Sequence, residues 1–397
     1  MKKLVIIGGG PAALMLAAQI DTNKYDVTLY DKKKTVGRKF LVAGEGGLNL
    51  TFDAPVDELI SQYYPSDFIA PILNQFSNND LINWLKSINV DTFIGSSNRV
   101  FPVAELKPID VLKKIVDHIK AKGVKLQLDT TWFGWDDKNQ LQLEKQDNLN
   151  SDITVFALGG SSWKVTGSEG DWAPLFNEKG IKTIPFKAAN CAFEVEWSKN
   201  FITTHKGKPL KNITIKFKDD ISKGEVVISS FGLEGNAIYA LSQKIQEELI
   251  SNDSTTIFVD LKPTMTVEQI LSKYKVSKLE KITDILKEDL NLDRTSIALI
   301  KHFTDKETFS NPEKLAGIIK SVPVTIRSAD DIDKAISTLG GIALDEIDEN
   351  FQLKNLPNSY TIGEMLDWYA PTGGYLLQAS FSMGFALASH LNKVKAN

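Results

Sequence analysis

The stretch VIIGGGPAALML, which begins at Val5, is the feature that most constrains the fold of this chain. The apolar run over residues 4–7 predicts a strand buried on both faces of a parallel sheet. The helix-forming residues after the glycines predict a helix, with Pro11 in its first turn, where proline is tolerated. A second apolar strand follows in YDVTLYD and ends at Asp31. Together these segments predict a βαβ unit.

The glycines between the first strand and the helix match a nucleotide-binding pattern. Gly8, Gly10 and Ala13 allow a tight turn, close approach of a pyrophosphate to the backbone, and close packing of helix on strand. The amino end of the helix favours the negative charge of the phosphates. Asp31, at the end of the second strand, is placed to bind ribose hydroxyls. Its alternative role is that of a solvated acid ahead of three lysines. We therefore predict a dinucleotide site.

Glycine-rich turns recur along the chain, and their spread favours FAD over NAD. They lie at Gly37, at residues 44–47 and 159–160, and in the segment 363–374. A ligand contacted by so many separate segments is long, as a flavin dinucleotide is. The expected cofactor is FAD.

The character of the chain changes twice and predicts an α/β fold with an insertion. Residues 1–185 and 337–397 are expected to form a split Rossmann-like FAD-binding domain. Strand patterns on both sides of residues 266–319 predict an inserted antiparallel β unit. The residues between them have a helical pattern with charged faces. The insertion has a size that suits a separate domain.

Composition excludes several classes of function. The net charge is only −4 over 397 residues, so the bulk basic charge of a nucleic-acid-binding protein is missing. The single cysteine, Cys191, excludes an internal disulfide and a Cys-x-x-Cys redox pair, and we interpret it as a small buried residue. With four histidines and no cluster, no metal site is expected. The apolar start is too short to span a membrane, and we expect a cytoplasmic protein.

Four ordered motifs then carry a resemblance to a known family. They are GRKFLVAGEGGLNLT, RVFP, ALGGSSWKVTGSEGDW and GEMLDWYAPTGGYLLQ, and GEVVISSFGLEGNAIYALS in the insertion extends the match. With these motifs the chain resembles the BaiN-type NAD(P)/FAD-dependent oxidoreductases. The resemblance implies an FAD-binding domain of the glutathione-reductase two-dinucleotide type. It also implies that this domain is split by an inserted β-barrel-like substrate domain over 186–265 and 320–336 and a small helical subdomain over 266–319.

The resemblance also implies which residues contact FAD. Residues of the first turn would hold the pyrophosphate: Gly8, Gly10, Pro11, Ala12 and Ala13. The adenosine end would meet Asp31, Lys32 and the strand of Trp132, and the phosphates or ribose would meet Arg38 and Lys39. Beside the flavin ring would lie Gly44, Gly46, Gly47 and Asn49, with Ala157 and Gly159 in a further turn. The ribityl chain and pyrimidine edge would meet Gly363, Glu364, Thr372, Gly373, Gly374 and Tyr375. The alternative role of Glu364, taken without the resemblance, is that of a surface acid.

The flavin loop departs from the commonest pattern of the family, which reads Gly-Gly-Gly-Arg-Cys-Asn. Here Glu45, Gly47 and Leu48 interrupt it, as in a sub-branch with Gly-Gly-Leu-Asn-Leu-Thr. Asn49 is retained and can contact flavin or substrate.

The first functional hypothesis is a flavin oxidoreductase in which NAD(P)H reduces FAD and the flavin reduces a small organic substrate. The insertion has no second strand followed by Gly-x-Gly-x-x-Gly, so either NAD(P)H would bind transiently or the electron donor would differ. Arg99 and Glu234 lie inside motifs and are candidate substrate contacts with Asn49. Their alternatives are a surface salt bridge for Arg99 and a helix-start acid for Glu234, while Tyr239 is interpreted as packing.

Two further hypotheses remain open. An FAD-dependent RNA-modifying protein would need a basic groove, for which the lysines of residues 204–218 are the candidates, against a solvated strand face. A flavin or nicotinamide sensor would bind the same cofactors without turnover.

Overall fold

The computed structural model describes residues 1–43 and 47–394. Its contacts divide the chain into two compact units, one of Met1–Ala188 with Ile332–Asn397 and one of Ala189–Asp331. The first unit therefore contains both ends of the chain. No helix in the described residues is both long and apolar enough to cross a bilayer.

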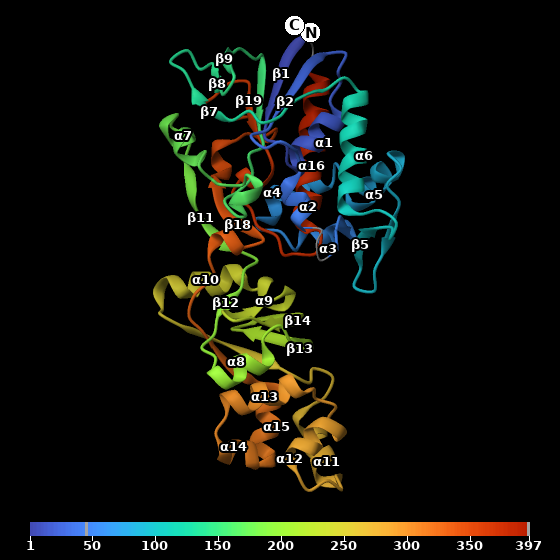
Figure 1. The fold of residues 1–397 in the computed structure, drawn as a ribbon, viewed down its shortest axis with the longest axis vertical. Coiled ribbons are helices and arrows are strands. Elements are labelled where there is room, and N and C mark those ends of the chain that lie inside the picture. Colours follow the sequence, from blue (N-terminus) through green and yellow to red (C-terminus); the bar gives the residue numbers. More distant parts are fainter. Residues whose placement is uncertain (44–46, 395–397) are drawn as a thin grey trace. The chain divides into compact units, whose positions relative to one another are not determined.

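A five-stranded parallel sheet forms the centre of the first unit (Figure 1). Its strands, in spatial order, are β19 (Ser359–Thr361), β10 (Ile153–Phe156), β1 (Lys2–Ile7), β2 (Tyr25–Tyr30) and β6 (Lys125–Gln127). The last four residues of β1 and all of β10 are buried, as expected for strands covered on both faces. The βαβ unit predicted from the opening stretch is confirmed by β1, α1 (Pro11–Gln19) and β2.

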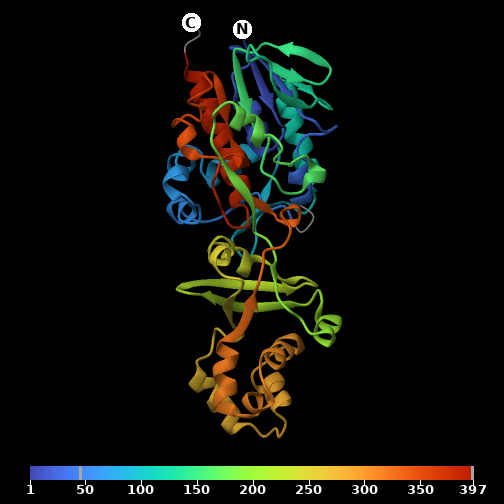
Figure 2. The ribbon, with the colours of Figure 1, turned by 90° about the vertical axis from the view of Figure 1, so that its left-hand side faces the viewer.

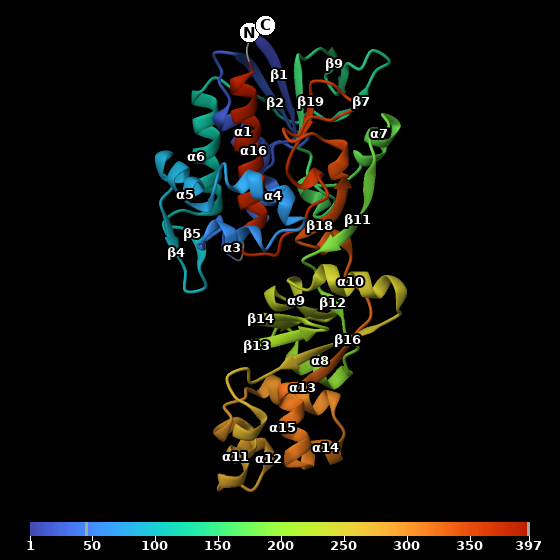
Figure 3. The same ribbon diagram turned by 180° about the vertical axis from the view of Figure 1, so that it is seen from behind.

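The C-terminal helix α16 (Tyr375–Lys393) packs along α1, so the two ends of the chain share one layer (Figure 3). Gly384 makes this close approach feasible, because a Cβ there would lie 2.3 Å from the carbonyl oxygen of Ala12. At the far end of the pair, the amide N–H of Asp21 donates to Asn392 Oδ1 at 2.8 Å. These contacts hold α16 and α1 together from the start of α1 to the residues that follow it.

Short elements complete the first unit. Its other helices are α2 (Arg38–Ala43), α3 (Val56–Ile60), α4 (Ser66–Leu73), α5 (Asn78–Ser87), α6 (Pro108–Ala121) and α7 (Ala173–Glu178), with 3₁₀ turns over Lys164–Thr166, Ile332–Lys334, Leu344–Glu346 and Gly363–Met365. Its small sheets join β3 (Thr51–Phe52), β5 (Arg99–Pro102) and β4 (Thr92–Ile94); β7 (Trp132–Trp135), β8 (Leu141–Leu143) and β9 (Gln146–Leu149); and β11 (Thr183–Ala189) with β18 (Ser337–Ile342).

The second unit is a curled antiparallel sheet with helices on both faces, around the long pair β13 and β14 (Figure 2). The strand order is β12 (Phe193–Glu194), β15 (Gly232–Glu234), β14 (Asp220–Ile228), β13 (Pro209–Phe217), β16 (Thr255–Asp260) and β17 (Val322–Ile326). The sheet curls far enough that the chain after β17 meets β12, where the Glu194 amide N–H donates to the Ser328 carbonyl at 2.8 Å. The predicted barrel-like character of the insertion is therefore confirmed.

The helices of the second unit are α8 (Lys199–His205), α9 (Asn236–Tyr239), α10 (Ser242–Ser251), α11 (Val267–Val276), α12 (Ile282–Asp284), a π turn over Ile285–Asp289, α13 (Arg294–Phe303), α14 (Lys306–Ser310) and α15 (Pro312–Lys320). The charged helical pattern over 266–319 thus forms a run of short helices. A separate subdomain over that range stays a prediction, because the contacts divide the chain into two units only.

Candidate cofactor-binding site

A cavity of about 710 Å³ lies in the first unit, at the carboxyl ends of β1, β2 and β10. Ligands of open parallel sheets bind at this edge. The residues that line it come from segments far apart in the sequence, among them 7–12, 30–32, 35–43, 48–49, 130–133, 157–159, 163–172, 362–364 and 372–377. Both halves of the split unit therefore contribute to one site.

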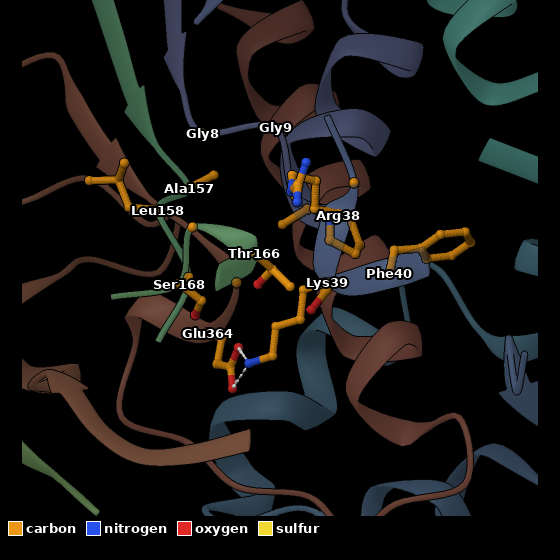
Figure 4. Close-up of a pocket in the computed structure, with 18 of the residues that line it drawn as sticks. Gly8, Gly9, Arg38, Lys39, Phe40, Ala157, Leu158, Thr166, Ser168 and Glu364 are labelled. Carbon is orange, nitrogen blue, oxygen red and sulfur yellow. Dashed lines mark hydrogen bonds and ion pairs between the residues drawn. The ribbon is translucent and has the colours of Figure 1, made fainter. Parts of the chain in front are cut away.

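The turn from β1 to α1 forms one wall of the cavity, and its geometry requires glycine. Gly8 has φ of +99°, and a Cβ there would lie 2.3 Å from the carbonyl oxygen of Ala157 (Figure 4). Gly10 is the N-cap of α1 and Pro11 its first residue. The first amides of a helix have no partners within it and carry partial positive charge. The wall can therefore bind an anion such as a pyrophosphate.

Asp31 follows β2 directly and also lines the cavity. Its Oδ2 accepts the Gly9 amide N–H at 2.8 Å, and its Oδ1 accepts the Lys33 amide N–H at 2.7 Å. Burial raises the pKa of Asp31, while these two hydrogen bonds and the charges of Lys32 and Lys33 act in the opposite direction. The carboxylate thus fixes the glycine turn. Its binding to a ribose stays a prediction.

Lys39 and Glu364 form an ion pair within the cavity wall. Lys39 Nζ lies 2.9 Å from Glu364 Oε2 (Figure 4). It also donates to Ser162 Oγ at 2.7 Å. Glu364 Oε1 also accepts the Thr338 amide N–H at 3.1 Å. Sequence reasoning expected Lys39 near phosphate or ribose and Glu364 near the ribityl chain, without expecting them to meet. Their pairing holds α2 against the Gly363–Met365 turn.

Four buried polar atoms in the lining residues have no hydrogen-bond partner among the described residues: Arg38 Nε, Asn49 Oδ1, Trp132 Nε1 and Ser168 Oγ. Only seven such atoms occur in the whole described part of the chain, so they concentrate at this cavity. Buried polar groups in native proteins are nearly always paired. Three of the four offer a hydrogen and two can accept one. The lining therefore fits a large polar ligand with both donors and acceptors, as FAD is.

Arg38 is the cation of the site best suited to a phosphate. It has no ion pair in the described part of the chain, whereas Lys39 pairs with Glu364 and Lys32 with Glu169 at 3.0 Å. Guanidinium groups bind phosphate oxygens in a bidentate manner.

No group of three or more described His, Cys, Asp or Glu side chains is arranged to hold a metal ion.

Tryptophan side chains supply much of the apolar lining. Trp132 packs against Trp135 and Phe156, with ring centroids 4.8 and 5.0 Å apart. Trp163 and Trp172 also line the cavity, with Thr166 and Ser168 between them. Sequence reasoning missed these four residues. The signal was available, since they all lie in the motif WKVTGSEGDW.

Most predicted cofactor residues line this one cavity: Gly8, Gly10, Pro11, Ala12, Asp31, Lys32, Arg38, Lys39, Asn49, Trp132, Ala157, Gly159, Gly363, Glu364, Thr372, Gly373 and Gly374. Three do not line it, namely Ala13, Gly47 and Tyr375. Ala13 is fully buried and acts in packing.

Of the candidate substrate contacts, Arg99 adjoins the lining at Gly373, and Glu234 lies in β15 of the second unit. Gly44 and Gly46 lie outside the described residues.

A parallel sheet with a glycine-rich first turn, and a long cavity lined from both ends of the chain, defines an FAD-binding Rossmann flavoenzyme. The chain belongs to the family described as HI0933-like protein Rossmann domain, whose model matches residues 2–390. The predicted membership in the family of BaiN-type flavoprotein oxidoreductases is confirmed, and the protein is an FAD-dependent oxidoreductase.

Two proteins are similar to this chain in sequence, and one solved structure is similar in fold. The 3-dehydro-bile acid delta(4,6)-reductase of Clostridium scindens is 23% identical over 413 residues, which cover 97% of this chain and 98% of that protein. The ribosomal RNA dihydrouridine synthase of Haemophilus influenzae is 23% identical over 402 residues and 98% of both chains. The structure of 3-ketosteroid delta1-dehydrogenase from Sterolibacterium denitrificans aligns with a TM-score of 0.52, at 11% identity, over 99% of this chain and 100% of that one.

Proposed function

We propose that this protein transfers electrons from NAD(P)H, through bound FAD, to a small organic substrate. The observation that carries the proposal is the set of four unpaired buried polar atoms around a cavity at the carboxyl edge of the sheet. A reductase among the relatives, the Clostridium scindens enzyme, supports the direction of electron flow.

Each wall of the cavity would hold a different part of FAD. The amides of the first turn, with Arg38, would bind the pyrophosphate, since both offer hydrogen bonds to anionic oxygens. Asp31 and Lys32 would meet the adenosine end, beside Trp132. The ribityl chain would meet Gly363, Glu364 and Lys39, and the flavin ring would meet Asn49 with the 372–374 turn. Ala157 and Gly159 would contribute backbone contacts between the two ends.

When bound, FAD supplies the redox chemistry, because it accepts two electrons as a hydride and passes them on. The residues of this chain orient the ring and exclude water from it. The amino end of α16, which begins at Tyr375, directs a positive dipole toward the 372–374 turn and stabilises negative charge there. NAD(P)H would bind transiently, since the insertion has no second dinucleotide-binding pattern.

The test is the absorption spectrum of the purified protein, recorded before and after adding NADH or NADPH without oxygen. We expect flavin bands that bleach with at least one of the two nucleotides. A flavin spectrum that neither nucleotide changes would contradict NAD(P)H as the donor and would favour a sensor or another reductant. A colourless protein that takes up no FAD would contradict the whole proposal.

A second candidate, reduction of a base in RNA, is favoured by the Haemophilus influenzae relative, which is a ribosomal RNA dihydrouridine synthase. Exposed lysines of the second unit are the available cations, such as Lys208 between α8 and β13 and Lys211 and Lys216 on β13. This candidate predicts RNA that co-purifies at low salt and is released by high salt, because phosphate contacts are salt-sensitive. It also predicts less dihydrouridine in ribosomal RNA when the gene is deleted. Unchanged dihydrouridine would exclude it.

A further inference from the structure

Arg99 lies beside the cavity with an uncompensated charge. In the described part of the chain its side chain makes no ion pair and no hydrogen bond. A Cβ placed on Gly373 would lie 3.3 Å from Arg99 Nε and 3.9 Å from its Nη2. Because Gly373 lines the cavity, the guanidinium lies against a residue of the cavity wall. A half-buried cation in this position is available to an anionic ligand.

Tyr375 adjoins the same glycine, since its Cε2 would lie 3.8 Å from the Gly373 Cβ. The Tyr375 ring is held on two sides, stacked on Phe52 at 5.2 Å and edge-on to Tyr63 at 5.9 Å. The Tyr63 hydroxyl also donates to the Tyr375 carbonyl at 2.8 Å. The side chain is only 9% exposed, yet its own hydroxyl has no hydrogen-bond partner among the described residues. A fixed ring thus presents a free hydroxyl.

The two groups keep their donor forms at neutral pH. Burial raises the pKa of Tyr375 to about 12, with Arg99 acting to lower it and Glu58 acting to raise it. A guanidinium remains charged in proteins. Arg99 and Tyr375, which both adjoin Gly373, therefore form a pair of hydrogen-bond donors, one of them cationic. The Glu58 carboxylate is the opposing charge that acts on Tyr375.

We propose that Arg99 and Tyr375 bind a carboxylate of the substrate, beside the 372–374 turn, so that the substrate is an organic acid. The inference rests on the proposed function for the position of the flavin ring near that turn. A carboxylate matches the site because it accepts from a guanidinium and a hydroxyl at once and compensates the charge of Arg99. Both side chains act in recognition, and the binding requires no change in their protonation.

The test compares two probes of equal shape, benzoate and benzamide, which differ in charge. Binding of each to the FAD-loaded protein is measured by titration calorimetry. We expect benzoate to bind at least about tenfold more tightly than benzamide, since hydrogen bonds to charged groups are the stronger ones. Arg99→Gln should abolish the preference and Arg99→Lys should keep part of it. Tyr375→Phe, which keeps the stacked ring, should weaken both probes by about fivefold.

The matched control is Arg327→Gln, since Arg327 lies in the second unit and pairs with Glu196 at 2.6 Å. This variant should keep the full preference for benzoate. Equal binding of the two probes to the wild type, or a preference retained in Arg99→Gln, would overturn the inference. The FAD content of each preparation is read from its absorption spectrum. A protein with FAD but no preference contradicts this inference alone, whereas a protein without FAD contradicts the proposed function.

Discussion

Asp31 is the residue whose side chain most directly holds the nucleotide turn, because it accepts two backbone amide hydrogens. Asp31→Ala leaves the amides of Gly9 and Lys33 without that acceptor. We expect the free energy of unfolding of the FAD-free protein to fall by about 3 kcal/mol, as hydrogen bonds to charged groups are worth more than neutral ones. Urea denaturation measures the change.

Asp26→Ala is the control, since Asp26 lies on β2, the strand that Asp31 follows. Asp26 pairs with Lys125 at 2.7 Å, with both side chains well exposed to solvent. Exposed pairs contribute about 0–1 kcal/mol. Equal losses of stability in the two variants would show that Asp31 has no special role in the turn.

Cys191 is a second residue with a definite chemical expectation. It is 1% exposed. Burial, and to a smaller extent the negative charge of Asp330, raises the pKa of its thiol from 9.0 to about 12. Only about one thiol in ten thousand is then ionised at pH 8, and the thiolate is the reactive form. Iodoacetamide should label Cys191 very slowly in the native protein and rapidly in urea. Rapid native labelling would contradict its burial.

The same shift predicts a pH dependence of stability. Between pH 9 and about 12 the native thiol keeps its proton while the unfolded chain loses it. The native state then binds more protons, so the stability that Cys191 contributes falls as pH rises through this range. Cys191→Ala should remove that part of the pH dependence, as measured by urea denaturation at pH 8 and pH 10.

At the scale of elements, the β1 to α1 turn depends on Gly8 for two separate reasons. In Gly8→Ala the new Cβ would be strained by the left-handed backbone and would also clash with the Ala157 carbonyl. In Gly123→Ala only the backbone strain applies, since φ is +92° and no atom lies within 4 Å of the Cβ position. The backbone penalty alone is about 1–2 kcal/mol. The free energy of unfolding should fall clearly more in Gly8→Ala than in Gly123→Ala. Gly8→Ala should also lose FAD binding. Equal losses in urea denaturation would exclude a role for the Ala157 contact.

How much of this site can be predicted from the sequence depends on how local its signals are. The Gly8 to Asp31 unit is predictable because strand, turn and helix follow one another within a short stretch. The pairing of Lys39 with Glu364 is not predictable, because it joins residues 325 positions apart through the fold. Trp163, Thr166 and Ser168 lie in a quoted motif, but no local rule assigns a turn of this kind to a cavity wall.

At the scale of the whole molecule, the chain builds one nucleotide site from its two ends and inserts a separate antiparallel unit between them. The strand patterns predicted the insertion because both sheets bury alternating or continuous apolar runs. Sequence boundaries were expected after residues 185 and 336, while the contacts divide the chain after 188 and 331. The curl that brings β12 to the chain after β17 depends on long-range hydrogen bonds that no local pattern reports.

The central claim, that this cavity holds FAD, is tested most directly by titrating the FAD-free protein with FAD while following tryptophan fluorescence. Four of the seven tryptophans line the cavity, namely Trp132, Trp163, Trp172 and Trp368. We predict strong quenching that saturates at one FAD per chain, and no saturable quenching in folded Gly8→Ala. A folded wild-type protein whose fluorescence does not change with FAD would contradict the account.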